Sequence, residues 1–202
     1  MNKQPVYYLQ TDPKWSGISY AASGERTTIG DAGCGPAAMA MILAEWCDKN
    51  VTPKIECAWA LRNGYKVKGQ GTSYSYFVPA AKRYGLTCRL LNASSIYGNS
   101  GSPFHATAKG AVDSGHLVIA CMGPGTWTTS GHFVLMWGVD GNTVYINDPY
   151  TKKAANTRGN YATFKRQVKY YYVIDNPRGR IGGSVNNAIK SAMETLREGM
   201  KK

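Results

Sequence analysis

The run PAAMAMILAEW, residues 36–46, constrains the fold more than any other part of the chain. Alanine, methionine and leucine favour a helix, and Pro36 suits its first turn. Because apolar residues occur on nearly every side of this helix, we expect it to be buried. The rest of the chain must then surround it. With 43% apolar residues in a length of 202, the chain can bury one ordinary core.

Helix signals dominate the first half of the chain, and strand signals dominate the second. Further helices are expected at residues 52–64, 73–84 and 102–114, with Pro79 interrupting the second. Short β-branched or aromatic runs predict strands at 86–91, 116–122, 132–139, 143–148 and 168–174. Asp140-Gly141-Asn142 spaces two of these strands as a tight antiparallel hairpin. The predicted class is α+β, with helices first and an antiparallel sheet second.

The composition changes again near Pro177. Residues 177–183 are rich in glycine and arginine, which predicts a flexible linker. Residues 184–202 place apolar side chains at helical spacing, which predicts an amphipathic tail that docks on its own domain or on a partner. Residues 1–176 then form the one large domain.

The chain is strongly basic and carries no recognisable export signal. Its 24 Lys and Arg against 12 Asp and Glu give a net charge of +12, which favours polyanionic surroundings. No apolar run reaches the length of a signal peptide or a membrane span, so we expect synthesis in the cytoplasm. The five cysteines are odd in number and lack CxxC spacing, which argues against a disulfide framework or a zinc site.

Cys34 is the candidate nucleophile. The glycine-rich turn GDAGCGP delivers this cysteine to the start of the central helix. The free N–H groups and the dipole of a helix N-terminus stabilise the nucleophilic thiolate over the thiol. Glycines on both sides let a substrate backbone approach the sulfur. The other cysteines, Cys47, Cys57, Cys88 and Cys121, are expected to be structural.

A nucleophilic cysteine needs a base, and His132 is the best placed of the three histidines. It begins a predicted strand, where a side chain can face a cleft at the rim of a sheet. His105 and His116 are expected to be structural or at the surface. The imidazole also needs an orienting acceptor. Asn147 and Asp148 end the hairpin's second strand, and only one of them can face His132, since consecutive side chains point to opposite faces; Asp148 is favoured, with Asn147 as the alternative.

The motifs LQTDPKW, TTIGDAGCGPAAMAMIL, SGHFVLMWGVDG and VYINDP, in this order, resemble the C39-like branch of the papain-like cysteine peptidases over about residues 7–175. The resemblance implies a papain-like fold and acyl transfer without metal or cofactor. It makes Cys34 the nucleophile, His132 the general base and later acid, and Asp148 the orienting carboxylate. It also implies that Gln10 and the backbone N–H of Cys34 form the oxyanion hole.

Within this family the amino-acid sequence around the site is most similar to those of the catalytic domains of phage or prophage endolysins. The implied function is a peptidoglycan hydrolase, either an endopeptidase or an amidase, that reaches the Gram-positive wall after holin-type release or lysis. Anionic wall polymers are possible partners of the basic surface. The candidate substrate-binding residues are Gly33, Tyr74, Tyr76, Trp127 and Gly131.

Three alternatives stay open at this point. The nearest is a protease that processes proteins or leader peptides after paired glycines, and Gly182-Gly183 is such a pair within the chain itself. A second is a basic binding module that has lost its chemistry. The third is nucleic-acid binding, which the charge favours but no nucleic-acid motif accompanies.

Overall fold

The structure is a computed structural model that describes residues 3–177. The predicted linker and helical tail therefore lie outside the described residues, apart from Pro177. The helical elements are α1 (Ile29–Ala32), α2 (Cys34–Trp46), α3 (Pro53–Arg62), the 3-10 turn η1 (Tyr74–Tyr76), α4 (Phe77–Arg83), α5 (Pro103–Asp113), α6 (Ala154–Thr157) and α7 (Tyr161–Gln167). The strands are β1 (Lys66–Val67), β2 (Gly71–Thr72), β3 (Thr87–Leu90), β4 (Leu117–Met122), β5 (His132–Asp140), β6 (Thr143–Asn147), β7 (Arg158–Asn160) and β8 (Val168–Asp175).

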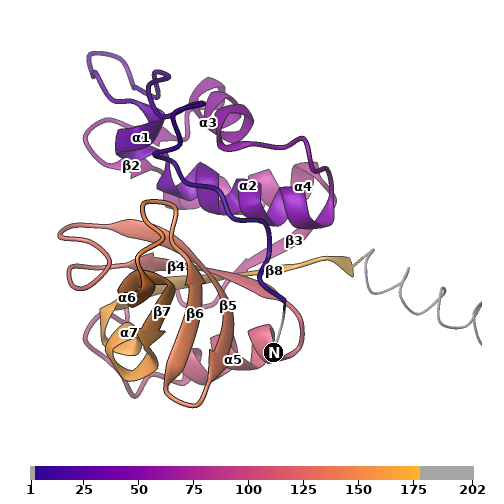
Figure 1. Ribbon diagram of the computed structural model, residues 1–202, viewed down its shortest axis with the longest axis vertical. Coiled ribbons are helices and arrows are strands. Elements are labelled where there is room, and N and C mark those ends of the chain that lie inside the picture. Colours follow the sequence, from indigo (N-terminus) through magenta and orange to yellow (C-terminus); the bar gives the residue numbers. More distant parts are fainter. Residues whose placement is uncertain (1–2, 178–202) are drawn as a thin grey trace, which may run out of the picture.

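The expected α+β class is confirmed. Figure 1 shows α1 to α4 in one half of the molecule and the large sheet in the other. All neighbouring strands of the six-stranded sheet are antiparallel, in the order β3-β8-β4-β5-β6-β7. Strands β1 and β2 pair separately. Among the described residues, no helix is both long and apolar enough to cross a membrane.

Helix α2 is the buried centre that its composition predicts. It begins at Cys34, and every residue from Gly35 to Ala44 is buried. Helices α3 and α4 pack against it on one side and strand β5 on the other. Because nearly all of its surface is covered, the position of its first residue is fixed against the start of β5.

The sheet separates two apolar cores. Alternate residues of β5 point to opposite faces, so Phe133 and Leu135 join the core under α2, whereas Val134 and Met136 join a second core. The second core is covered by α5 and α7, which contribute Val112 and Phe164. Both faces of β4 and β5 are therefore buried, which explains why these strands read as continuous apolar runs.

The hairpin predicted at Asp140-Gly141-Asn142 is present. Asp140 pairs with Thr143 in the antiparallel register, so Gly141 and Asn142 form the turn. Gly141 has a φ of 53°, which glycine adopts without steric cost. The hairpin brings the end of β6 beside the first part of β5, since Leu135 pairs with Asn147. It thus places residue 148 close to residue 132.

Local signals predicted the long elements well and the short ones poorly. Pro79 does not interrupt a helix, because η1 ends at Tyr76 and α4 begins at Phe77, which places Pro79 in the first turn of α4. Apart from α4, which lies within the predicted helix 73–84, the helices of four to seven residues and the strands of two or three residues were not predicted. Those are α1, α6, α7, β1, β2 and β7. Segments this short lack a readable hydrophobic period and depend on packing.

Candidate active site

The turn that carries Cys34 is built by two successive helical segments. Helix α1 begins with a capping box, in which Thr28 and Asp31 satisfy each other's backbone N–H groups. Gly33 ends α1 and serves as the N-cap of α2. Cys34 is therefore the first residue of a 13-residue helix and is half-buried. This confirms the placement predicted from the GDAGCGP turn.

Gly33 has a different role from the predicted one. It is buried behind the cysteine and lines neither pocket described below. A Cβ at this position would lie 2.6 Å from the carbonyl oxygen of Ile29 and 2.9 Å from its Cγ2. The expectation that Gly33 contacts substrate is therefore wrong. Its missing side chain lets α1 pack against the start of α2.

His132 connects Cys34 to Asp148. It begins β5 and is 8% exposed. Its Nε2 lies 2.7 Å from Oδ1 of Asp148, and the ring also forms a side-chain hydrogen bond with Cys34. Because Nε2 is occupied by the carboxylate, Nδ1 is the ring nitrogen that faces the sulfur. Thiol, imidazole and carboxylate thus form one hydrogen-bonded series, with the first group from the helical half and the other two from the sheet.

Mutual stabilisation of charge dominates this series. Burial opposes ionisation of Cys34, but the hydrogen bond and positive charge of His132 and the backbone N–H groups of Phe133 and Gly35 lower the pKa of the thiol. Burial also disfavours the imidazolium, but the hydrogen bonds and negative charges of Asp148 and Cys34 raise the pKa of His132 to about 10. The pair therefore favours thiolate with imidazolium, and it titrates as a unit.

This electrostatic arrangement predicts fast alkylation of Cys34 at low pH. The rate with iodoacetamide is expected to follow an apparent pKa below that of an ordinary thiol, about 8.5, because the thiolate is the reacting form. Peptide mapping after timed reactions between pH 5 and 10 measures this. Cys47, which is exposed just after α2, is the internal comparison. A Cys34 rate that rises only above pH 8.5 would contradict the arrangement.

Asp148, and not Asn147, contacts the histidine. Its Oδ1 also accepts the backbone N–H of Tyr150 at 2.8 Å, and its Oδ2 lies 3.4 Å from Nδ2 of Asn156. The hydroxyl of Tyr7 accepts the N–H of Asp148 at 3.1 Å. These contacts fix the carboxylate in one orientation. Neither Tyr7 nor Asn156 was predicted, since no local pattern distinguishes them from ordinary loop residues.

Asn147 points to the other side and holds the N-terminal segment. Its Nδ2 donates to the carbonyl oxygens of Pro5 and Val6, both at 3.2 Å. Its Oδ1 accepts from Nε2 of Gln4 at 2.8 Å. Because consecutive side chains point to opposite faces, Asp148 contacts His132 whereas Asn147 binds the N-terminal segment.

Gln10 lies between the loops that carry Cys34 and Asp148. Its backbone N–H donates to the carbonyl of Pro149 and its Nε2 donates to the carbonyl of Gly30, both at 2.7 Å. The side chain is buried, and Oε1 has no hydrogen-bond partner within residues 3–177. An amide nitrogen carries two N–H groups, and the bond to Gly30 uses one of them. The predicted oxyanion-hole role of Gln10 stays a prediction.

The cleft at Cys34 consists of two adjoining pockets that share Cys34, Gln70 and Gly131. One encloses about 200 Å³ and has a mixed lining, in which Val67, Tyr74 and Phe133 stand beside Thr72 and Ser73. The other encloses about 260 Å³ and is polar and rich in glycine; its lining includes Glu25, Thr27, Asp31, Gly69, Gly71 and Ser130. A chain laid across the sulfur would meet different chemistry on its two sides.

The predicted substrate-binding residues separate into two groups. Tyr74 and Gly131 line the cleft, and Tyr74 is 46% exposed. The expectation for Tyr76 is wrong, because its ring is fully buried and its hydroxyl donates to Glu56 at 2.8 Å. Trp127 does not line this cleft. Its indole packs against Phe164, and the residue lines a separate pocket.

The remaining histidines are structural, as expected. Nδ1 of His105 lies 2.9 Å from the Tyr171 hydroxyl, and Nε2 lies 2.9 Å from the carbonyl of Asn99. Burial lowers the pKa of His105, which keeps the ring neutral. His116 lies 3.1 Å from the carbonyl of Ala111 and 3.6 Å from Asp175, away from Cys34.

A buried helix that presents a thiol to an imidazole and a carboxylate on an antiparallel sheet defines a class of protein: the cysteine peptidases with a papain-like α+β fold. The model of the Peptidase_C39 like family matches residues 7–177, and the chain belongs to this family. The family assignment made from the motifs is therefore confirmed.

A solved structure agrees with this fold. A C39-like peptidase from Bacillus anthracis has a TM-score of 0.52 at 16% identity, over 86% of this chain and 99% of that one. The peptidase domain of Streptococcus ComA, a bifunctional ABC transporter of a quorum-sensing pathway, has a TM-score of 0.49 at 21% identity, over 71% and 92%. At these identities the likeness concerns the fold. No curated protein shows significant similarity to the chain.

Proposed function

We propose that this peptidase is a peptidoglycan hydrolase that cleaves an amide bond of the Gram-positive wall. The observation that carries the proposal is a hydroxyl-rich pocket of about 340 Å³ beside the triad. Its lining comprises Gly125, Thr126, Trp127, Thr128, Thr129, Tyr150, Thr151, Lys153 and Asn156. This hydroxyl-rich pocket is adjacent to the triad, because the side chain of Asn156, which lines it, contacts Asp148.

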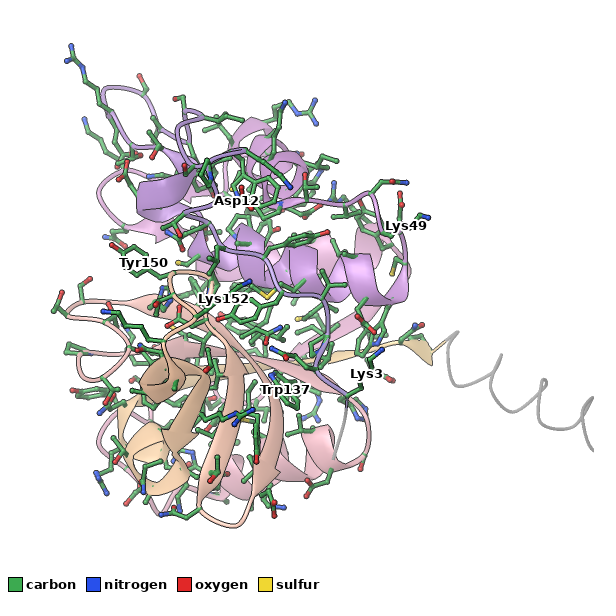
Figure 2. All side chains as sticks on the ribbon, viewed as in Figure 1. Lys3, Asp12, Lys49, Trp137, Tyr150 and Lys152 are labelled. Atoms are coloured by element: carbon green, nitrogen blue, oxygen red, sulfur yellow. The ribbon has the colours of Figure 1, made fainter. Side chains whose placement is uncertain are left out.

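The composition of this pocket suits a sugar. Threonine hydroxyls and the Asn156 amide can exchange hydrogen bonds with hydroxyl and acetamido groups. Tyr150 is 60% exposed, and an exposed ring offers a flat apolar face of the kind on which sugar rings pack. Figure 2 shows Tyr150 at the level where the helical half meets the sheet. A glycan held here would bring its attached peptide towards Cys34. The net charge of +12 also favours an anionic wall.

The proposed reaction is acyl transfer with Cys34, His132 and Asp148 in the roles that their geometry allows. The thiolate of Cys34 attacks the carbonyl carbon, and the negative oxygen is held by the backbone N–H of Cys34 and the amide of Gln10. The C–N bond then breaks as the imidazolium of His132 gives its proton to the departing amine. Water, deprotonated by His132, attacks the thioester and releases the carboxylate and the thiolate. Asp148 keeps the ring oriented throughout.

A second candidate, cleavage after paired glycines, has one observation in its favour. Gly69, Gly71 and Gly131 all line the polar pocket at Cys34. Their lack of side chains leaves room for close approach of a substrate backbone. The hydroxyl-rich pocket plays no part in this function. The two candidate functions therefore differ in whether they require Tyr150.

The deciding experiment is mass spectrometry of fragments released from purified Gram-positive peptidoglycan, with paired-glycine peptides digested in parallel. Wild type is expected to release wall fragments, and Cys34→Ala is expected to release none. Fragment masses distinguish a bond within the peptide from the amide between sugar and peptide. Tyr150→Ala should slow wall digestion more than peptide digestion. If the paired-glycine peptides were cleaved and the peptidoglycan was not, the second candidate function would replace this proposal.

A further inference from the structure

We propose that a fourth pocket, which shares no lining residue with the two pockets at Cys34, binds a phosphate group. The N-terminal segment and strands β5, β6 and β7 enclose a pocket of about 470 Å³. The lining residues are Gln4, Pro5, Tyr7, Trp137, Tyr145, Ile146, Lys152, Thr157 and Arg158. None of them lines the two pockets at the cysteine. Figure 2 shows Trp137 and Lys152 on the side of the molecule where this segment passes the sheet.

The charge of this pocket is uniformly positive. Lys152 and Arg158 line it, and no Asp or Glu does. Within residues 3–177, neither cation has a carboxylate in ion-pair distance, although Lys66, Arg83 and Lys109 each pair with one. Nζ of Lys152 lies 5.2 Å from the centre of the Tyr7 ring, which holds the ammonium group at the pocket.

The wall of the pocket contains a donor without an acceptor. Trp137 is 8% exposed, its ring packs against Tyr145 with centroids 5.1 Å apart, and its Nε1 is buried with no hydrogen-bond partner in the described part of the chain. Buried donors are normally paired. A small shift of the Trp137 ring on ligand binding would bring this N–H to an acceptor in the pocket.

These features together point to a phosphate ester. Two cations supply charge-assisted hydrogen bonds to phosphate oxygens, and Arg158 can engage two oxygens at once. The exposed part of Tyr145 offers an apolar surface for the organic group of the ester. The volume lies in the range of small-molecule sites and exceeds what a bare phosphate needs. The ester can be free in solution or part of a polyol-phosphate chain, and the two sources share this chemistry.

The test is a titration of the full chain, followed by tryptophan fluorescence, with glycerol 3-phosphate in one arm and poly(glycerol phosphate) in the other. Binding is expected to change the fluorescence of wild type, and Trp137→Phe is expected to remove that change. Lys152→Gln and Arg158→Gln should each weaken binding about fivefold, a typical effect of one exposed charge contact.

Lys165→Gln is the matched control. Lys165 also lies over a tyrosine ring, with Nζ 5.5 Å from the centre of Tyr161, but it does not line the pocket. It should leave binding unchanged. Equal weakening of binding by all three charge variants would show a diffuse effect of net charge and would overturn the proposal. Unaltered fluorescence in both arms of the titration would also overturn it. Tighter binding of the polymer at equal phosphate concentration assigns the site to a chain; equal binding assigns it to a free ester. No turnover is needed, so failure here and failure of the proposed hydrolase are separate results.

Discussion

Replacement of Cys34 by alanine is expected to lower kcat by about a million-fold, the scale seen when the nucleophile of a catalytic triad is removed. The sulfur forms the covalent bond to the acyl group, and neither His132 nor Asp148 can replace it in that step. The fold should survive, because Cys34 is half-buried and alanine is a good helix former. Fragment release from the wall measures the effect, and circular dichroism checks the fold.

Cys47→Ala is the control for this result. Cys47 is exposed at the end of α2, 13 positions from the nucleophile, and its removal should leave kcat within about twofold of wild type, as for most surface substitutions. If Cys34→Ala retained more than about 1% of the wild-type kcat, the acyl-enzyme route would be excluded, because a lost nucleophile costs several orders of magnitude.

Asp148→Asn should produce the second largest loss in kcat, smaller than the about ten-thousand-fold loss from the same change in a serine triad, because Cys-His-Asn triads of papain-like proteases work with a neutral amide at this place. The amide has the size of the carboxylate, but it carries no charge and can present its N–H to the ring. His132 then loses the partner that fixes its tautomer and stabilises its charged form. Rates of fragment release measured at saturating substrate give this value.

The pH profile makes this prediction specific. Hydrogen bonding and charge from Asp148 raise the pKa of His132 towards about 10, so activity should fall on the alkaline side as the imidazolium loses its proton near there. In Asp148→Asn that support is gone, so the alkaline limb should move to lower pH. Asn156→Ala removes only the 3.4 Å contact to Oδ2 and should shift the limb little. An unmoved limb in Asp148→Asn would contradict the assigned role.

The three residues of the series could be located from sequence because each stands at the end of a regular element. Cys34 starts a helix that its composition makes buried, and His132 and Asp148 flank a hairpin whose turn is marked by Gly141. The periods of helix and strand extend over many residues and tolerate local exceptions. The hairpin placed both Asn147 and Asp148 near His132, and only the structure decides between them, because Asp148 contacts the ring.

The residues that line the cleft were harder to predict than the triad. Their exposure depends on which side of a short segment packs against the rest of the protein. Tyr74 and Tyr76 lie in the same 3-10 turn, yet one lines the cleft and the other is sealed beside Glu56. Their local sequence, YSY, is symmetric and carries no information about that choice. Gly33 was similarly ambiguous, because a glycine gives the same signal whether it makes room for a ligand or for a neighbouring helix.

The series of thiol, imidazole and carboxylate is divided between the two halves of the molecule. Cys34 belongs to the helical half, whereas His132 and Asp148 belong to the sheet. Neither half holds a complete reaction centre, so chemistry is a property of their contact surface. A ligand that keeps Cys34 apart from His132 would therefore inhibit the enzyme without forming a covalent bond to the sulfur.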